Sequence, residues 1–386
     1  MQQLTGLDAT FLHLETAAQF GHVSGLSIFA RPEDPAYDPY AAWRGRLCER
    51  LDHLPPLRRR LREVPLGLDH PYWIDDPDFD VDFHVRHTAV PPPGRDDQLA
   101  ATVSRLVARP LDRRRPLWLS YVIEGLSDDR FAVLTIVHHA TVDGASGVEL
   151  LTLMLDDAPQ APGDPAPSQP WHGEPVPGDA AMLARGLLGL ARKPARGVLL
   201  GARTARELGR ATRNPALVAA ANQVRGSLRG PVGTLLNLGR DRGQERDAPN
   251  PLPSIRPPRT PFNDKITPHR RLAIGSAPLD AVKAIKNAYG VTVNDVVMAV
   301  CAGGLRTWLE LHDALPDDPL VALVPVSVRT GQETERWTNR VSMLSTVLPT
   351  DEPDPVARLH EVHRAMDTSK GLFQALPAER LTDAAE

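Results

Sequence analysis

Two adjacent histidines are the residues of this chain that are best placed to do chemistry. The segment His138–Gly144 reads HHATVDG and follows the apolar run FAVLTIV at residues 131–137. A neutral imidazole is available near pH 7, so a histidine at the end of a buried strand can act as a general base. Asp143 follows His139 by four residues, where the turn places it to hold local geometry, and Gly144 permits close backbone approach. Two incidental histidines before a capped helix are the alternative, but the spacing favours a catalytic motif.

The segments around this motif include both strands and helices, as the spacing of their apolar residues predicts. Strands are expected at Leu117–Glu124 and Arg130–His138, joined by the turn GLSDD, and a helix at Asp143–Leu155 follows. The rest of the N-terminal half predicts a helix at Asp38–Leu54, a strand at Val81–His87 and a helix at Asp96–Ala108. The C-terminal half predicts helices at Leu279–Tyr289, Thr292–His312 and Asp354–Met366, and strands at Leu320–Val328 and Arg340–Leu348.

Proline divides the chain into parts. The 38 prolines are about twice the usual share of ~5%, and they concentrate at Asp157–Pro177 and Ala248–Pro261, which are typical of stiff linkers. The prediction is an N-terminal lobe at residues 1–157 that carries the motif, a linker and helical crossover at 158–261, and a C-terminal lobe at 262–386. Two lobes of similar α/β make-up favour an active site between them.

Composition narrows the class of protein. A net charge of −4 disfavours nucleic acid as a partner, and two cysteines, Cys48 and Cys301, indicate a reducing compartment. No Lys or Arg precedes Arg31, and the longest uncharged apolar run, residues 296–305, is about half a membrane span. We therefore expect a cytoplasmic protein. No metal site is expected either, since neither histidine pair, 84/87 or 360/363, has suitable spacing.

Several ordered motifs together resemble a known family. HHATVDG is similar to the HHxxxDG motif of the CoA-dependent acyltransferase superfamily, whose members have a two-lobed, chloramphenicol acetyltransferase-like α/β fold. The further motifs are LTGLDATFLHLET from Leu4, Pro116-Leu117-Trp118, Asn294-Asp295, PVSVRT from Pro325 and NRVSMLSTVLPT from Asn339. These resemble the bacterial wax ester synthase/diacylglycerol acyltransferases, especially the actinobacterial ones. Such proteins usually continue several dozen residues further, so the C-terminal lobe is expected to be incomplete, and Thr338 replaces a glycine common before Asn339.

The resemblance implies a reaction and assigns roles. A long-chain acyl group moves from acyl-CoA, a co-substrate, to diacylglycerol or a long-chain alcohol, with no cofactor. His139 would be the base, while His138 would orient the turn. Asp143, beside Gly144, would be structural, with Arg329 as its candidate partner. Asn294 would either donate a hydrogen bond near the acyl carbonyl or solvate its helix end. The expected substrate-binding residues are Pro116, Trp118, Asp295 and Arg329, with Trp118 packing the cleft wall.

Two alternatives to this function stay open. One is acyl transfer to a polyketide-derived or carrier-bound acceptor. The other is a catalytically silent protein of a lipid surface, against which the intact His139 and Asp143 argue.

The composition of the middle of the chain predicts contact with a lipid surface. Between Val176 and Gly230 there are ten Lys or Arg residues against two acidic ones, Asp179 and Glu207. Leucines accompany these charges, and basic amphipathic stretches can lie on anionic membranes. We therefore expect peripheral contact with the inner membrane or with lipid droplets, although a solvated crossover helix packed on the lobes has the same pattern.

Overall fold

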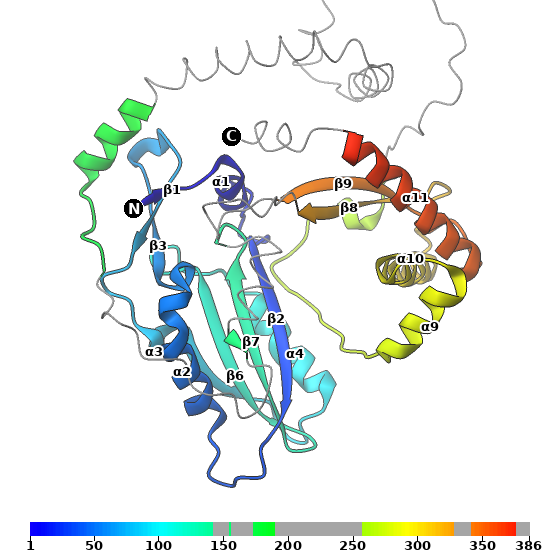
Figure 1. Cartoon of the computed structure of the whole chain (residues 1–386), viewed down its shortest axis with the longest axis horizontal. Helices are drawn as coiled ribbons and strands as arrows, with labels where there is room; N and C mark the ends of the chain where they lie inside the picture. Colours follow the sequence, from blue (N-terminus) through cyan, green and yellow to red (C-terminus); the bar gives the residue numbers. More distant parts are fainter. Residues whose placement is uncertain (142–153, 156–172, 190–256, 328–340, 376–386) are drawn as a thin grey trace, which may run out of the picture.

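The computed structural model describes residues 1–141, 154–155, 173–189, 257–327 and 341–375. A four-stranded sheet forms the centre of the N-terminal part, in the order β2 (His22–Ala30), β7 (Arg130–His138), β6 (Trp118–Leu126) and β5 (Val85–Ala89). Neighbours are antiparallel except β5 and β6, which run parallel. Figure 1 shows α1 (Gly6–His13) at the upper end of this sheet, where β7 ends and β2 begins.

The two central strands, β6 and β7, are covered on both faces by helices, and this explains why they are continuously apolar. On one face α2 (Pro39–Arg50) places Leu47 in a core with Trp118 and Val137. On the other, α4 (Asp96–Val107) places Leu99 and Val103 against alternate residues of β6 and β7. All of β7 after Arg130 is buried, so the apolar run before the histidines is fixed from both sides.

A small second sheet flanks the first. Its order is β1 (Gln2–Gln3), β4 (Tyr72–Asp75) and β3 (Arg59–Arg62), with antiparallel pairing throughout. The single-turn helices beside it are η1 (Leu51–His53), η2 (Pro55–Arg58) and η3 (Pro65–Gly67). A further helix at residues 179–189 packs on the outer side of this sheet region (Figure 1).

The strand predicted at Val81–His87 is partly wrong. Residues Val81–His84 form a single helical turn, α3, and only the chain from Val85 onward is strand. The Asp80 side chain accepts a hydrogen bond from the Asp82 amide at 2.9 Å, which caps this turn. His84 is then held inward by a 2.8 Å contact between its Nδ1 and the Trp118 carbonyl oxygen, a tertiary contact that an alternating pattern does not reveal.

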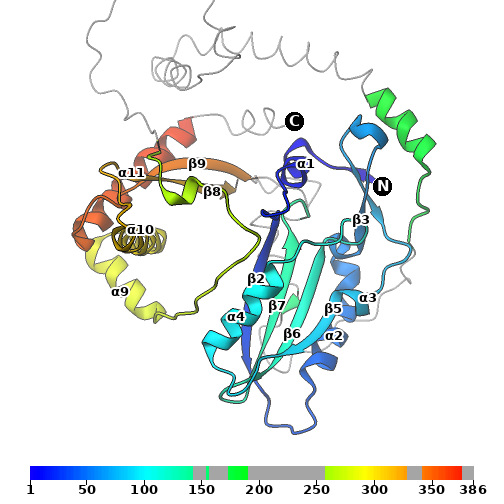
Figure 2. The ribbon, with the colours of Figure 1, turned by 180° about the vertical axis from the view of Figure 1, so that it is seen from behind.

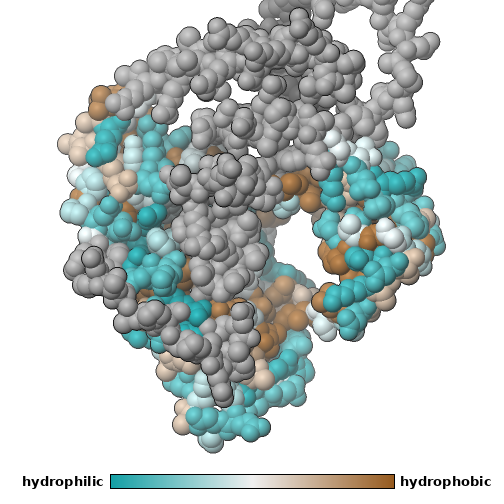
Figure 3. Space-filling model, in the orientation of Figure 1, coloured by the Kyte–Doolittle hydropathy of each residue, from teal (hydrophilic) through white to brown (hydrophobic). Residues whose placement is uncertain are grey.

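The C-terminal part packs two helices against a hairpin. It contains η4 (Pro261–Asn263), α9 (Leu279–Tyr289), α10 (Val293–Leu311), the antiparallel pair β8 (Leu320–Ser327) and β9 (Val341–Leu348), and α11 (Pro355–Ala375). Leu344, Val362 and Met366 form its buried centre together with partly buried residues of α10 and β8. In Figures 1 and 2 the β8–β9 pair points toward α1 and the start of β2, and Figure 3 shows an open space between the two parts.

Most predicted helices and strands outside the undescribed segments are present within a few residues of their expected ends. Membrane spanning is a separate question: no single described helix is long and apolar enough to cross a bilayer, and α9 with α10 meets the length and composition test only as a pair bent by 102°.

Candidate active site

Both histidines lie where β7 ends. His138 is the last residue of the strand, opposite His22 on β2, and its amide donates to the Leu117 carbonyl at 2.9 Å. The chain then turns at once, since the Thr141 amide donates to the His138 carbonyl, also at 2.9 Å. The predicted strand-to-turn position of the motif is therefore confirmed through Thr141. Asp143, Gly144 and Arg329 lie outside the described residues, so their roles stay predictions.

His138 is locked in one tautomer. Its side chain is 1% exposed, and its Nδ1 accepts a hydrogen bond from the Ala140 amide at 3.0 Å. The proton of the neutral ring therefore lies on Nε2, which is 3.2 Å from the Glu15 carboxylate. Burial lowers the pKa of His138 to about 4, against the raising effect of Glu15. A buried neutral ring whose Nδ1 is hydrogen-bonded to the turn and whose Nε2 lies near Glu15 is suited to orienting the turn.

Glu15 gathers the contacts around His138. Its Oε1 accepts from the Gly21 amide at 2.8 Å, and its Oε2 accepts from the Arg113 guanidinium at 2.6 Å. Arg113 also donates to the Leu12 carbonyl at 2.5 Å. Although burial raises the pKa of Glu15, the Gly21 amide, Arg113 and His138 together hold it below its usual value. Glu15 is thus ionised, and its carboxylate faces the Nε2–H group of the buried His138 ring.

His139 is held differently from His138. Its amide donates to the Gly21 carbonyl at 2.7 Å, and its ring stacks on Phe11 of α1, with centroids 4.1 Å apart and planes 16° apart. The side chain is only partly buried. The motif therefore has one histidine sealed in the interior and one whose ring stacks on Phe11 and is partly open. A general base must be within reach of its substrate, and of the two rings only that of His139 is partly open.

Gly21 fits between the two histidines only because it has no side chain. A Cβ there would lie 2.7 Å from His138 Nε2 and 3.0 Å from the Phe11 carbonyl oxygen. Its amide and carbonyl meanwhile serve Glu15 and His139. One residue, directly before β2, therefore links the anion that faces His138 to the backbone of His139.

Two other predicted residues, Pro116 and Trp118, flank Leu117, whose carbonyl oxygen accepts from the His138 amide. Pro116 and Trp118 are buried, and the Trp118 indole donates to the Leu57 carbonyl at 2.7 Å and stacks on His84. Trp118 is therefore a core residue beside β7, and contact of Pro116 or Trp118 with substrate stays a prediction.

Asn294 and Asp295 sit in the first turn of α10. The Thr292 hydroxyl caps this helix by accepting from the Asp295 amide at 3.2 Å. The Asp295 carboxylate accepts from the Thr292 amide at 2.9 Å and lies 2.8 Å from His363 Nδ1. Asp295 is buried, whereas Asn294 is exposed. The capping role weighed for Asn294 thus belongs to Thr292 and Asp295, and substrate contact by Asn294 or Asp295 stays a prediction.

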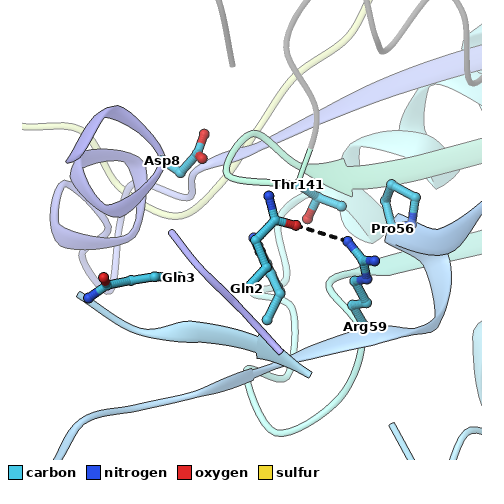
Figure 4. A pocket seen from close by; sticks show the side chains of 7 residues that line it. Gln2, Gln3, Asp8, Pro56, Arg59 and Thr141 are labelled. Carbon is cyan, nitrogen blue, oxygen red and sulfur yellow. Dashed lines mark hydrogen bonds between the residues drawn. The ribbon is translucent and has the colours of Figure 1, made fainter. Parts of the chain in front are cut away.

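A small polar cavity lies behind the catalytic turn. It holds about 20 Å³, roughly the room of one water molecule, and its lining includes Gln2, Asp8, Arg59 and Thr141. Figure 4 shows the Thr141 side chain directed toward Gln2, whose amide oxygen accepts from Arg59 at 3.1 Å. The buried Thr141 hydroxyl has no hydrogen-bond partner among the described residues. This cavity suits a bridging water and is too small for an acyl chain.

Metal ligation finds no support in the part of the chain that the structure describes, where no three His, Cys, Asp or Glu side chains converge.

Comparison with known proteins decides the family. The model of the wax ester synthase/diacylglycerol acyltransferase catalytic domain matches residues 4–297, and the model of the C-terminal domain of the same family matches residues 337–386. The chain belongs to the wax ester synthase/diacylglycerol acyltransferase family. The resemblance drawn from the motifs is thereby confirmed, and so is the two-lobed CoA-dependent acyltransferase fold.

Relatives of this acyltransferase cover nearly all of the chain. A Mycobacterium bovis protein named as a diacylglycerol O-acyltransferase is 34% identical over 370 residues, which are 96% of this chain and 74% of the relative. The wax ester synthase/diacylglycerol acyltransferase from Marinobacter aquaeolei VT8 has a solved structure with a TM-score of 0.63 and 30% identity, covering 100% of this chain and 75% of its own. A condensation domain of the calcium-dependent antibiotic synthetase shares the fold at 17% identity, with a TM-score of 0.50 and coverage of 100% and 78%.

Sequence reasoning had assigned no role to Phe11, Glu15, Gly21 or Arg113. Two of these residues stood inside the quoted motif LTGLDATFLHLET, but only as part of a resemblance. Arg113 is 98 residues from Glu15, so no local spacing could have joined them.

Proposed function

We propose that this acyltransferase moves a long-chain acyl group from acyl-CoA to diacylglycerol, giving triacylglycerol, or to a long-chain alcohol, giving a wax ester. The observation that carries the proposal is the difference in burial and contacts between the two histidines of the motif. His138 is sealed in as a neutral ring against Glu15, while the partly open His139 ring rests on Phe11.

His139 acts as the base in this reaction. It takes the proton of the acceptor hydroxyl while the acceptor oxygen forms a bond to the thioester carbonyl carbon. When the tetrahedral intermediate collapses, the carbon–sulfur bond breaks and the imidazolium returns the proton to the CoA thiolate. Such acid–base assistance is typically worth ~10²–10⁴-fold in rate. No acyl-enzyme is required in this sequence of steps.

Holding both substrates next to His139 supplies a further part of the rate. When two reactants are held in the correct geometry, the attack becomes effectively unimolecular, which can be worth ~7–11 kcal/mol. Rigid placement of the base is necessary for this gain. The Gly21 carbonyl, which accepts from the His139 amide, and the Phe11 ring, which stacks on the imidazole, support that placement.

The proposed acceptors are lipids, so the enzyme must meet a lipid surface. The excess of basic residues between Val176 and Gly230 supports peripheral contact with anionic membrane or with lipid droplets from the cytoplasmic side.

The test uses palmitoyl-CoA with dioleoylglycerol or hexadecanol, both dispersed in detergent. Free CoA thiol is measured continuously, and triacylglycerol and wax ester are separated and quantified at the end. The expected result is CoA release that depends on the acceptor and equals the ester formed, with His139→Ala as the inactive control. Release of CoA without an acceptor would instead indicate thioester hydrolysis, and no release with either acceptor would refute the proposed substrates.

A further inference from the structure

One corner of the N-terminal part exposes leucines in an unusual way. Leu66 lies at the tip of the β3–β4 connection, 86% exposed, with φ 62° and ψ 11°. Leucine rarely adopts this left-handed region, and Gly67 beside it has φ 61°. The chain therefore holds a large apolar side chain out into solvent at a position where its backbone conformation is unfavourable.

The helix at residues 179–189 adds two more leucines to this corner. Gly186 of the helix is packed so close to Val64 and Leu68, which flank Leu66, that a Cβ there would lie 2.7 Å from Val64 Cγ1. An ion pair of 2.5 Å between Arg62 and Asp179 fixes the start of the helix. Leu187 and Leu188 follow Gly186 and are 55% and 57% exposed.

The solvent side of this helix is almost wholly apolar. Its exposed positions beyond Asp179 are Ala180, Ala181, Ala184, Arg185, Leu187 and Leu188. A helix on the surface of a globular protein normally turns charged residues to water. Here Arg185 is the single charge among those outward positions, and Figure 3 shows hydrophobic colour at this upper corner.

We propose that Leu66, Leu187 and Leu188 form a leucine wedge that inserts into the surface of an anionic phospholipid bilayer. The proposal rests on the proposed function, because it names the surface from which the lipid acceptor is taken. Two further observations indicate lipid as the occupant. In Figures 1 and 2 the helix at residues 179–189, α1 and the end of β7 that carries His138 lie at the same end of the N-terminal part. Directly after the helix, residues 190–230 carry nine Lys or Arg and one Glu, which complements an anionic lipid surface.

The wedge and the basic residues make different contributions to binding. Burial of leucine in the acyl region is driven by removal of apolar surface from water and is not screened by salt. Attraction of arginine to anionic headgroups is screened within about 3 Å at 1 M salt. The wedge therefore predicts a residual, salt-resistant component of binding to vesicles.

The first experiment reads the environment of one wedge position. In a Cys48→Ser/Cys301→Ser background, Leu66→Cys is labelled with an environment-sensitive fluorophore and mixed with phosphatidylcholine–phosphatidylglycerol vesicles. We expect a blue shift and quenching by doxyl-labelled acyl chains. Leu311→Cys, on the C-terminal part and 77% exposed in the free protein, is the matched control and should show neither effect. Equal behaviour of the two labels would overturn the wedge.

The second experiment removes the wedge. The triple variant Leu66→Ser/Leu187→Ser/Leu188→Ser should lose vesicle partitioning at 1 M salt by about 10³-fold, since each fully buried leucine is worth roughly tenfold or more and the three factors multiply. Turnover of a short-chain acyl-CoA with a water-soluble alcohol should stay unchanged, so failure of the wedge is distinguishable from failure of the acyl transfer. Unchanged partitioning would overturn the proposal, and so would loss of a dimer in sedimentation, which would assign the leucines to a contact between copies of this chain.

Discussion

At the scale of single residues, the two histidines of the motif should differ sharply. His139→Ala should lower kcat by ~10²–10⁴-fold while the protein stays folded, because it removes the base. His138→Ala should lower kcat less and lower the thermal midpoint more, because His138 is a buried ring bonded to Ala140 and facing Glu15. Steady-state kinetics with melting curves for both variants check this. Reversed effects would assign the base to His138.

Gly21 offers a residue-scale prediction that depends on geometry alone. In Gly21→Ala the new methyl group meets His138 Nε2 and the Phe11 carbonyl at 3.0 Å or less, so the start of β2 or the His138 ring must move. We expect a loss of about 1–3 kcal/mol in the free energy of unfolding and at least tenfold in kcat. Gly45→Ala on α2 is the control, since nothing lies within 4 Å of its Cβ and alanine favours a helix. Wild-type kinetics in Gly21→Ala would show that this packing does not position the motif.

The histidines were predictable from sequence because their signal is local. A buried strand followed by two histidines and a tight turn is written in consecutive residues, and the structure has the strand and turn where they were expected. Glu15, Gly21 and Arg113 were missed because their roles arise from strand pairing and from contacts across 98 residues. Nothing in the types of these three residues distinguishes them from ordinary polar or turn residues.

At the scale of elements, the turn α3 depends on a neutral histidine. Burial lowers the pKa of His84 to about 4, and its Nε2 has no hydrogen-bond partner among the described residues. In the unfolded chain a histidine has a pKa near 6.5, so between pH 6.5 and 4 the unfolded state binds a proton that the folded state does not. The free energy of unfolding therefore falls as the pH drops from 6.5 toward 4. His84 should contribute about 3 kcal/mol to this loss.

The measurement is denaturant unfolding at several pH values for wild type and His84→Phe. The variant loses the bond to the Trp118 carbonyl and should be less stable at pH 7, but its stability should fall less steeply below pH 6.5. His138 adds a loss of the same sign, since its pKa is also about 4, so the slope should shrink and not vanish. An unchanged slope in His84→Phe would show that the ring is not the proton-linked group.

Asn294 and Asp295 form one motif in the sequence, but in the first turn of α10 they have different environments. Asp295 is buried, caps the helix and joins it to α11 through His363, so Asp295→Asn should lower the free energy of unfolding by about 1–3 kcal/mol. Asn294 is exposed, so Asn294→Ala should leave stability within about 0.5 kcal/mol and lower kcat. Melting curves and kinetics on both variants check this. If both variants changed kcat at constant stability, the two side chains would share a substrate-binding role.

Helix and strand positions were largely predictable at this scale, and burial was not. The helical period of apolar residues and the capping residues predicted the limits of α4, α9 and α10. Thr292 caps the start of α10, and Gly290 ends α9 in the left-handed conformation. Trp118 was expected at a cleft wall because of its motif, whereas tertiary packing encloses it among Leu47, Leu54 and Leu57. Sequence patterns indicate which residues face a core, but they do not indicate whether further elements pack over those residues and enclose them.

At the scale of the whole molecule, the proposed lipid contact predicts a characteristic response to salt. The chain has a net charge of −4, yet residues 190–230 carry nine basic residues and one acidic residue. Each basic residue close to an anionic surface contributes about 1 kcal/mol, and this attraction is screened within a Debye length of ~8 Å at physiological salt. Binding to vesicles should therefore rise with phosphatidylglycerol content and fall steeply as salt is increased, down to a component that the leucine wedge supplies.

Replacing Arg192, Arg196, Arg203 and Arg206 with glutamine should remove most of the salt-dependent component and leave the salt-resistant component in place. The same four positions changed to lysine keep their charge and should bind as wild type does, which separates charge from packing. Turnover of a soluble short-chain acyl-CoA should be equal in all three proteins, because the catalytic turn lies on other elements. A loss of soluble turnover in the glutamine variant alone would instead show that these arginines bind the phosphates of CoA, and salt-independent vesicle binding of wild type would show that the basic segment does not face lipid.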